Sequence, residues 1–148
     1  IRLLEEVREK MGAIYGGGYS ASMERDPYPH YAVQTQLQCG PENVDKIIAK
    51  LNDLVKEMKD NGPSQENLDK AKASIQEKRR ENLKKNNYWM SKLQQIQFWG
   101  YSQDRFLNIE NVVDKISVAD IKATANKLFD GKNEFLATMK PEVEEEKK

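Results

Sequence analysis

The sequence predicts an α+β domain in which a mostly antiparallel sheet carries helices on one of its faces. Two segments with strand-like alternation lie close together early in the chain, several helical patterns follow, and one alternating segment returns near the end. Strands that precede a run of helices are typical of α+β folds, whereas parallel sheets need strands and helices that alternate. Three strands are few for so many helices, and the chain opens within a helical pattern. We therefore expect a domain that is incomplete at its N-terminus.

The composition bounds the classes of function. The chain has 148 residues, a usual size for one domain, and 24 Lys and Arg residues balance 24 Asp and Glu residues. Without excess positive charge, nucleic-acid binding is not expected, and no apolar run approaches the ~20 residues of a membrane-spanning helix. Cys39 and His30 are the single cysteine and histidine. The chain therefore cannot form an internal disulfide or, by itself, a catalytic zinc site with its several His or Cys ligands.

The first elements are expected to be a helix and a hairpin. Apolar residues up to Met11 lie on one helical face, and Gly12 ends this helix. Residues 14–24 then alternate, with Tyr, Ala and Met set against Gly and Ser, which predicts a strand. Residues 31–39 alternate more clearly, since Ala and three glutamines separate Tyr, Val, Thr, Leu and Cys. We expect this second strand to bury one face, and the two strands to pair as an antiparallel hairpin around a turn at residues 26–29.

The next helices follow from their apolar spacing and from local start and stop signals. An apolar stripe at residues 44–58 predicts a long helix, and Ser64 is a good N-cap for the following one. A helical pattern continues from there to Gly100. We expect a break near residues 86–87, because ~36 residues without interruption are unusual for a globular helix.

The last elements are expected to be two short helices and a strand. Residues 109–116 carry apolar side chains at helical spacing, and Ser117 begins a capping box for a helix that runs to Phe129. The sequence Asp-Gly then ends this helix. The alternation over residues 134–140 predicts a final strand, which a proline stops.

Two clusters of side chains have both a structural and a functional interpretation. The basic residues at 78–80 and 84–85 form either a solvated helix face, which we favour because glutamates are interleaved, or a contact for an acidic partner. The aromatic residues at 88–101 either pack around a helix end, which we favour, or form a ligand platform. The lone His30 is interpreted as a turn residue.

Gly16, Gly17 and Gly18 are the first candidate for a functional segment. They do not form a phosphate-binding loop, because no Gly-Lys-Ser/Thr follows and no helix begins there. Glycines inside a strand instead indicate a bulge, a twist or the close approach of another backbone.

Arg8 and Tyr15 are the most specific candidates for chemistry. The end of a helix, the break at Gly12 and the start of a strand lie between them, so the chain reversal can turn both side chains towards one cleft. A guanidinium and a phenol are both hydrogen-bond donors, and two donors aimed at one point suit a carbonyl oxygen or a developing oxyanion. The alternative is that Arg8 pairs with Glu5 and that Tyr15 belongs to the core.

Around these residues the sequence resembles the pitrilysin/insulinase family of zinc metallopeptidases, peptidase family M16. Non-catalytic C-terminal domains of that family carry an R-E-x-x-G-x-x-Y-like pattern before a strand of small and polar residues, and Arg8, Glu9, Gly12 and Tyr15 match it. The resemblance covers nearly the whole chain. It includes the Gly-Pro before the long helix, the Ser-Gln-Glu start of the next helix, the Asn-Tyr-Trp stretch, and the Val-x-Asp-Ile helix before the expected final strand.

The resemblance implies a fold and a place for the zinc. Members form a two-halved clamshell of homologous α+β domains with a LuxS/MPP-like metallohydrolase fold. Residues 1–141 then correspond to the C-terminal part of one such domain, and residues 142–148 to a charged tail. The family binds zinc through an inverted H-x-x-E-H motif in an N-terminal domain. Because this sequence has no such motif, the zinc of the full-length protein is expected outside this chain.

The resemblance also implies a role for the candidate residues. The half opposite the zinc supplies an Arg and a Tyr that grip the substrate backbone near the scissile bond, and by position these are Arg8 and Tyr15. Gly16, Gly17 and Gly18 would lie beside the bound peptide, where small residues permit close backbone contact. The chain is thus expected to be the substrate-gripping C-terminal domain of a zinc-dependent endopeptidase and inert by itself. Its substrate is a peptide or protein, and its partner is the N-terminal half or a homologous subunit.

Two other functions stay open at this stage. The chain fits a catalytically inactive structural or assembly subunit of the same family, and it also fits an unrelated α+β interaction module that uses the basic helix. An upstream H-x-x-E-H motif with a downstream Glu would separate these alternatives. The single unpaired cysteine and the relatives that the sequence resembles favour the bacterial periplasm, with the cytoplasm as the alternative compartment.

Overall fold

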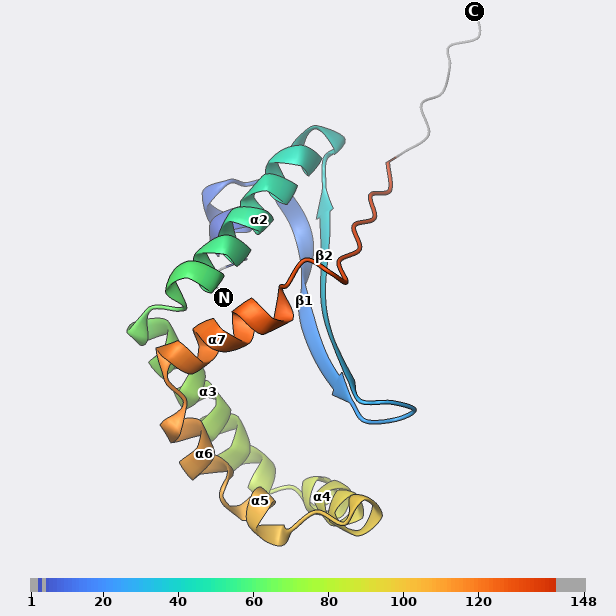
Figure 1. The fold of residues 1–148 in the computed structure, drawn as a ribbon, viewed down its shortest axis with the longest axis vertical. Coiled ribbons are helices and arrows are strands. Elements are labelled where there is room, and N and C mark those ends of the chain that lie inside the picture. The colour runs from blue at the N-terminus through green and yellow to red at the C-terminus, as the bar shows by residue number, and fades with distance from the viewer. Residues whose placement is uncertain (1–2, 4, 141–148) are drawn as a thin grey trace, which may run out of the picture. The chain divides into compact units, whose positions relative to one another are not determined.

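A computed structural model describes Leu3 and residues 5–140, and the chain divides into two compact units (Figure 1). Of the described residues, those up to 56 and those from 131 form the first unit, and residues 57–130 form the second. In chain order the elements are η1 (Glu5–Lys10), β1 (Ile14–Glu24), β2 (His30–Cys39), η2 (Pro41–Asn43), α2 (Val44–Asn61), α3 (Gln65–Leu83), α4 (Asn86–Trp99), α5 (Gln103–Leu107), α6 (Ile109–Lys115) and α7 (Val118–Leu128). An antiparallel pair of strands followed by helices confirms the predicted α+β class.

The first unit is organised around a small apolar core. Its buried residues come from η1, from the start of β1 and from α2, and Leu3, Leu37, Cys39 and Leu51 pack against them. The buried members of this core are Val7, which is fully buried, and Ala13, Ile14 and Ile47. The helical spacing of the apolar residues on α2 explains its part in this core, since side chains four residues apart lie on one face. This core fixes the junction between η1 and β1.

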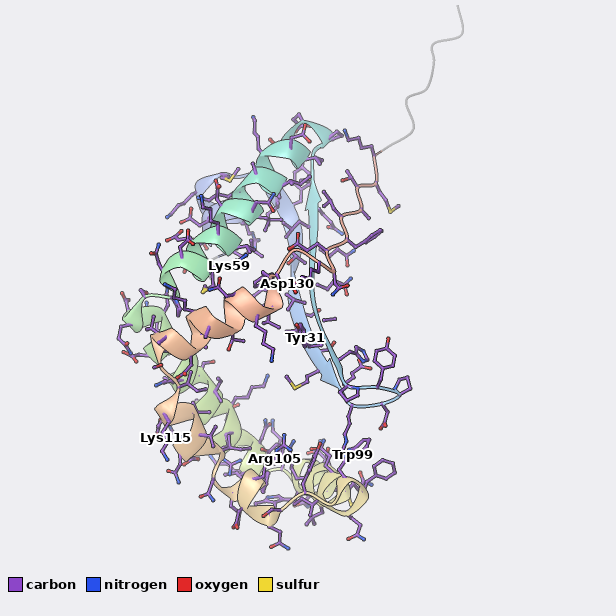
Figure 2. All side chains as sticks on the ribbon, viewed as in Figure 1. Tyr31, Lys59, Trp99, Arg105, Lys115 and Asp130 are labelled. Carbon is purple, nitrogen blue, oxygen red and sulfur yellow. The ribbon has the colours of Figure 1, made fainter. Side chains whose placement is uncertain are left out.

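The hairpin is less buried than the sequence predicts. Residues that are paired across the two strands lie on the same face of the hairpin. The pair Gly18 and Gln36 lies on a polar face, and the pair Met23 and Tyr31 lies on the opposite, apolar face. The prediction that β2 buries one face is wrong over most of its length, because Val33 and Tyr31 are 44% and 48% exposed; Figure 2 labels Tyr31 on this hairpin. The physical reason is that the core covers the hairpin only at its end near Leu37.

The predicted start and stop signals of the long helices are confirmed. The hydroxyl of Ser64 accepts a hydrogen bond of 3.2 Å from the backbone N–H of Asn67 and caps α3. The expected break lies between α3 and α4, just before residues 86–87. Gly100 ends α4 with a positive φ of 65°, a conformation that glycine adopts without a steric penalty. No helix in the described part of the chain is long and apolar enough to cross a membrane.

The C-terminal helices combine one confirmed cap with one element that the sequence analysis missed. Ser117 and Asp120 form the predicted capping box at the start of α7: each side chain accepts a hydrogen bond from the other residue's backbone N–H. The short helix α5, which Ser102 caps, was not predicted. Its single turn carries too little apolar periodicity to be recognised in a sequence.

The prediction of a final strand at residues 134–140 is wrong. Residues 134–140 form no strand in the structure, and the side chains of Phe135 and Met139 are 92% and 98% exposed. Alternation creates a strand only where a neighbouring edge supplies partners for the backbone N–H and C=O groups. The predicted charged tail, residues 142–148, lies outside the described residues, and the assignment of residues 1–141 to one domain stays a prediction.

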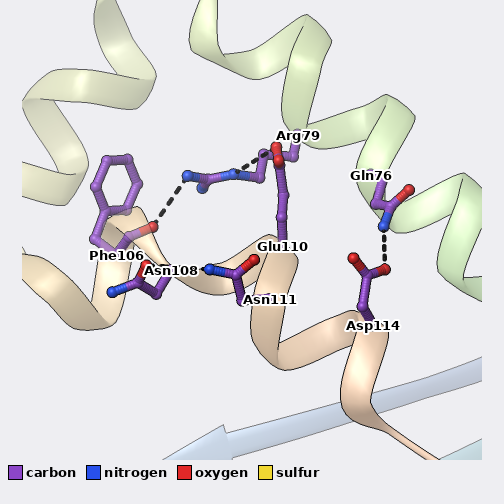
Figure 3. A network of polar contacts seen from close by, with 7 residues as sticks. All are labelled: Gln76, Arg79, Phe106, Asn108, Glu110, Asn111 and Asp114. Atoms are coloured by element: carbon purple, nitrogen blue, oxygen red, sulfur yellow. Dashed lines mark hydrogen bonds and ion pairs between the residues drawn. The ribbon is translucent and has the colours of Figure 1, made fainter.

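The basic stretch on α3 is not uniformly solvated, which corrects the favoured interpretation. Arg79 is only 8% exposed, whereas its neighbour Arg80 is exposed. As Figure 3 shows, the Nη2 group of Arg79 donates a hydrogen bond of 3.0 Å to the carbonyl oxygen of Phe106, and its Nε lies 3.4 Å from a carboxylate oxygen of Glu110. The same helix face also carries Gln76, whose amide donates a bond of 2.6 Å to Asp114 (Figure 3). This face therefore packs on α5 and α6.

The aromatic residues divide between packing and exposure. Tyr88 and Trp89 at the start of α4 flank the buried ring of Phe106, with ring centroids 5.8 Å and 5.5 Å apart. This part agrees with the packing interpretation. At the other end of α4, Phe98 contacts Trp99 edge-on but is 77% exposed.

Candidate functional site

The position of Arg8 follows from the burial of its neighbour. Val7 is fully buried in the core of the first unit and fixes η1 against α2. Arg8, the next residue, is exposed, and its side chain forms no hydrogen bond or ion pair with any other described residue. The alternative in which Arg8 pairs with Glu5 is therefore wrong. A guanidinium without an internal partner keeps all of its N–H donors for a ligand or for water.

Glu6 fastens η1 to α2 on the other side of Val7. Its carboxylate accepts a hydrogen bond from Lys10 and lies 2.9 Å from the ammonium nitrogen of Lys50 on α2. The hydrogen bond from Lys10, followed by that from Lys50, lowers the pKa of Glu6 from 4.5 to about 2. Glu6 is thus ionised throughout the neutral range and holds the helix that carries Arg8.

Gly12 makes the chain reversal between Arg8 and the hairpin. Its φ is 58°, and its backbone N–H donates a hydrogen bond of 3.1 Å to the carbonyl oxygen of Arg8. The N–H of Ala13 then donates a bond of 3.2 Å to the carbonyl oxygen of Val7. These bonds close the end of η1 and direct the chain into β1, so Gly12 ends the helix as predicted.

Tyr15 occupies an irregularity at the start of β1. Ile14 pairs with Cys39 and Gly16 with Gln38, so Tyr15 is one extra residue on its strand, the arrangement of a β-bulge. Its side chain is 77% exposed and has no hydrogen-bonding partner among the described residues. The alternative interpretation, in which Tyr15 belongs to the core, is therefore wrong. A bulge redirects a side chain out of the regular alternation, and here it leaves the phenol in solvent.

The three glycines have different roles in the hairpin. A Cβ atom on Gly17 would lie 2.2 Å from the carbonyl oxygen of Gln36, and the φ of Gly17 is 127°, so this glycine permits the close approach of β2. A Cβ atom on Gly16 would lie 3.6 Å from the side chain of Gln38, an ordinary contact distance. A Cβ atom on Gly18 would meet open space. The expected close approach of a backbone is thus found within the hairpin itself.

A groove of about 410 Å³ lies along the hairpin beside these glycines. Its lining residues are Gly17, Gly18, Tyr19, Ser20, Gln34, Gln36 and Gln38. The glutamines follow one another on the polar face of β2, and each amide offers two N–H donors and one carbonyl acceptor. Sequence reasoning identified them only as the wet face of the strand, although their alternation was the available signal. Arg8 and Tyr15 do not line this groove.

The described residues do not fit a catalytic metal. They contain no group of three or more His, Cys, Asp or Glu side chains that could hold a metal ion. The Nδ1–H of His30 donates a hydrogen bond of 2.9 Å to the carbonyl oxygen of Tyr28, and its Nε2 lies 3.7 Å from a carboxylate oxygen of Glu24. One imidazole beside one carboxylate is too small a ligand set for catalytic zinc, which takes three protein ligands.

Comparisons with known proteins identify the fold and the family of the chain. The structure superposes on the periplasmic protease PqqL from Escherichia coli with a TM-score of 0.69 and 14% sequence identity, which covers 86% of this chain and 14% of that chain. This likeness shows a shared fold. No curated protein sequence matches the chain. The sequence model of the family described as the peptidase M16 inactive domain matches residues 1–75, which include η1, the hairpin and the whole candidate site. The chain therefore belongs to the family of the peptidase M16 inactive domain.

Proposed function

We propose that the chain is the substrate-gripping, non-catalytic part of a zinc-dependent endopeptidase. The proposal is supported by the exposure of two donors, Arg8 and Tyr15, on either side of the chain reversal at Gly12. Both side chains lack partners in the described part of the chain, and the core residue Val7 and the bulge hold them in place. Exposed arginine and tyrosine side chains on a rigid support are typical of binding sites.

The chemistry of these two groups suits a peptide carbonyl. A guanidinium offers fixed N–H donors and a phenol offers one O–H donor, and both kinds of donor bind carbonyl oxygens. Donors at an oxygen that gains negative charge during hydrolysis stabilise the transition state more than the ground state. Arg8 and Tyr15 would thus act on the substrate, while water activation by zinc is assigned to a part of the enzyme outside this chain.

The groove supplies the complementary contacts for the rest of the peptide. Gln34, Gln36 and Gln38 line one side of it, and the open space above Gly18 lets a second backbone approach β1 closely. An extended peptide exposes alternating N–H and C=O groups, and amide side chains can pair with both kinds. The groove therefore favours peptide backbone over a particular side chain.

The remainder of the enzyme is part of the same proposal. The chain spans 14% of the length of PqqL, so the catalytic zinc would be supplied by another domain or by a homologous subunit. The isolated chain is then inert towards peptides. Because PqqL is a periplasmic protease, the proposal places the parent protein in the periplasm.

The proposal is tested first by peptide binding to this chain. A capped, extended peptide of alternating Ala and Val, titrated into the isotopically labelled chain, should shift the backbone amides of residues 15–18 in a saturable way. Tyr15→Phe and Arg8→Gln should weaken binding, since each removes donors without removing much volume. Tyr28→Phe removes a hydroxyl from another exposed tyrosine of the hairpin and should bind normally. Equal binding by all of these variants would reject the site.

The second test uses the complete peptidase. Tyr15→Phe should lower kcat/KM by roughly 10²–10³, equivalent to about 2.7–4 kcal/mol, if the hydroxyl meets the developing oxyanion. If the hydroxyl only orients the bound peptide, KM should rise while kcat holds. A full-length protein that folds, binds zinc and cleaves no peptide would instead make the chain part of an inactive assembly subunit.

A further inference from the structure

A second pocket, separate from the hairpin groove, lies within the helical unit formed by residues 57–130. It has a volume of about 230 Å³ and is lined by residues from the second half of α4 through the start of α6. Two cationic side chains, Lys92 and Arg105, and two neutral polar ones, Gln95 and Ser102, line it together with aromatic and aliphatic groups. No acidic side chain is among the described residues that line it. The pocket is therefore lined by positively charged side chains and by apolar ones.

The two cations are held in place without a carboxylate partner. The ammonium group of Lys92 donates a hydrogen bond of 3.1 Å to the side-chain carbonyl oxygen of Gln95 and lies 5.7 Å from the ring centroid of Tyr88. The guanidinium of Arg105 stacks 4.4 Å from the ring centroid of Tyr101. Within the part of the chain that the structure describes, neither cation forms an ion pair with Asp or Glu. Contacts with rings and amides orient a cation but leave its charge uncompensated.

Hydrogen-bond donors remain available at the pocket. A guanidinium that stacks on a ring keeps the N–H groups at its edge, and the amide nitrogen of Gln95 still carries both of its hydrogens. The hydroxyl of Ser102 accepts from the backbone N–H of Asp104 at 3.2 Å, and its own hydrogen can still be donated. A ligand that accepts hydrogen bonds and carries negative charge would satisfy all of these groups.

Arg79 lies next to the pocket but is ion-paired with Glu110. Its guanidinium lies 5.0 Å from the ring centroid of Phe106, which is one of the lining residues, although Arg79 itself does not line the pocket. Its Nε and Nη1 atoms are buried and have no hydrogen-bond partner, and the nearby Glu110 is half exposed. Because the carboxylate of Glu110 compensates this charge, Lys92 and Arg105 are the cations that an anion would meet at the pocket.

We propose that this pocket binds one small oxyanion, a carboxylate or a phosphate group, through Lys92 and Arg105. Its volume is below the ~300–1,000 Å³ of sites for drug-sized ligands, which favours a single acidic group over a whole cofactor. Arginine and lysine are the side chains that recognise carboxylate and phosphate oxygens through charge-assisted hydrogen bonds. This site goes beyond the proposed gripping of a peptide backbone and does not depend on it.

The test titrates three probes into the isotopically labelled chain at low salt. Inorganic phosphate and a capped Ala-Glu-Ala peptide carry the two candidate oxyanions, and a capped Ala-Gln-Ala peptide is the neutral match for the second. We expect saturable shifts of the backbone amides of residues 92–106 with phosphate or the Glu peptide, and none with the Gln peptide. The oxyanion that binds more tightly identifies the source of the ligand. Added sodium chloride should weaken either interaction by screening.

Substitutions decide whether the named cations are responsible. Arg105→Gln and Lys92→Gln should each weaken binding roughly tenfold or more, the value of one charge-assisted hydrogen bond. Lys115→Gln removes an exposed charge on α6 that does not line the pocket, and it should bind as the parent chain does (Figure 2). Circular dichroism of each variant shows whether the helices persist, and either cation variant suffices if the other unfolds. Shifts that do not saturate, or equal affinity in all three variants, would overturn the proposal.

Discussion

The two units of this molecule are stabilised in different ways. In the first unit, Val7, Ala13, Ile14 and Ile47 form an apolar core that holds η1, the hairpin and α2 together. In the second unit, the face of α3 that meets α5 and α6 is largely polar. Arg79 bonds to a carbonyl of α5, and Lys72 and Gln76 bond to Asp114 on α6.

The difference between the units lies in how strongly each contact constrains position. Apolar burial is non-directional and depends on the area removed from water, so a small core can fix a junction while leaving nearby side chains exposed. Hydrogen bonds depend on distance and angle, so the polar contacts of α3 specify its orientation against α6 at modest net free energy. The exposed donors Arg8 and Tyr15 therefore lie beside an apolar core, whereas the proposed anion pocket includes residues of α5, which a hydrogen bond from Arg79 joins to α3.

The largest expected effect is the loss of the apolar core. Ile47→Ala removes a buried side chain and should lower the free energy of unfolding of the first unit by about 2–5 kcal/mol. Hydrogen exchange should show faster exchange in the hairpin amides, while the amides of α3 and α6 keep their protection. Equal loss of protection in both units would show that the two units do not unfold independently.

A matched pair of glycine substitutions tests how the first unit forms its groove. Gly17→Ala should destabilise the hairpin by about 1–3 kcal/mol from its backbone conformation alone, and the overlap with the carbonyl oxygen of Gln36 adds to this. Gly18→Ala meets open space and should leave the melting temperature nearly unchanged while weakening peptide binding. Thermal melts and the peptide titration separate these effects. A stable Gly17→Ala variant would contradict the strained geometry at this position.

A buried arginine provides the corresponding test in the second unit. Arg79→Ala should destabilise that unit by about 1–3 kcal/mol, because the buried carbonyl of Phe106 loses its donor. Arg79→Met keeps most of the volume and removes two unsatisfied nitrogens, so it should cost less than the alanine variant. Urea unfolding measures both changes. If methionine costs as much as alanine, the charge itself, rather than the packing, stabilises this interface.

The smallest effect is expected from acid. The pKa of Glu6 is depressed to about 2 in the folded chain, so its contribution is fully present above the unfolded value of 4.5 and is lost as the pH falls towards 2. Stability should therefore decline across this window, and Glu6→Gln should reduce the decline. Glu66 on α3 is a matched control, since its pKa is lowered by a hydrogen bond from Lys70 within the same helix. Between pH 5 and pH 2.5, the fall in melting temperature should be reduced more by Glu6→Gln than by Glu66→Gln, because Glu6 joins two elements and Glu66 bonds within one helix.

Some features of the candidate site depend on neighbouring residues, and others depend on residues that are distant in the chain. Arg8, Tyr15 and the glycines were identified from their order along the chain, because a helix end, a glycine and a strand start are local features. Their exposure was not predictable, since it depends on what the core covers. The groove and its glutamines were also missed as a site, because they require the register between two strands.

The elements whose start and stop signals lie within a few residues could be predicted from the sequence alone. Gly12 and Gly100 ended their helices as predicted, and Ser64 and Ser117 began theirs, because the bonds that cap a helix join residues only a few positions apart. Which faces of these elements are buried depends on the tertiary structure. Arg79 lies inside although its neighbours are charged, and the alternating residues 134–140 form no strand. Burial and strand pairing depend on partners distant in the chain, and no local pattern specifies whether such a partner is present.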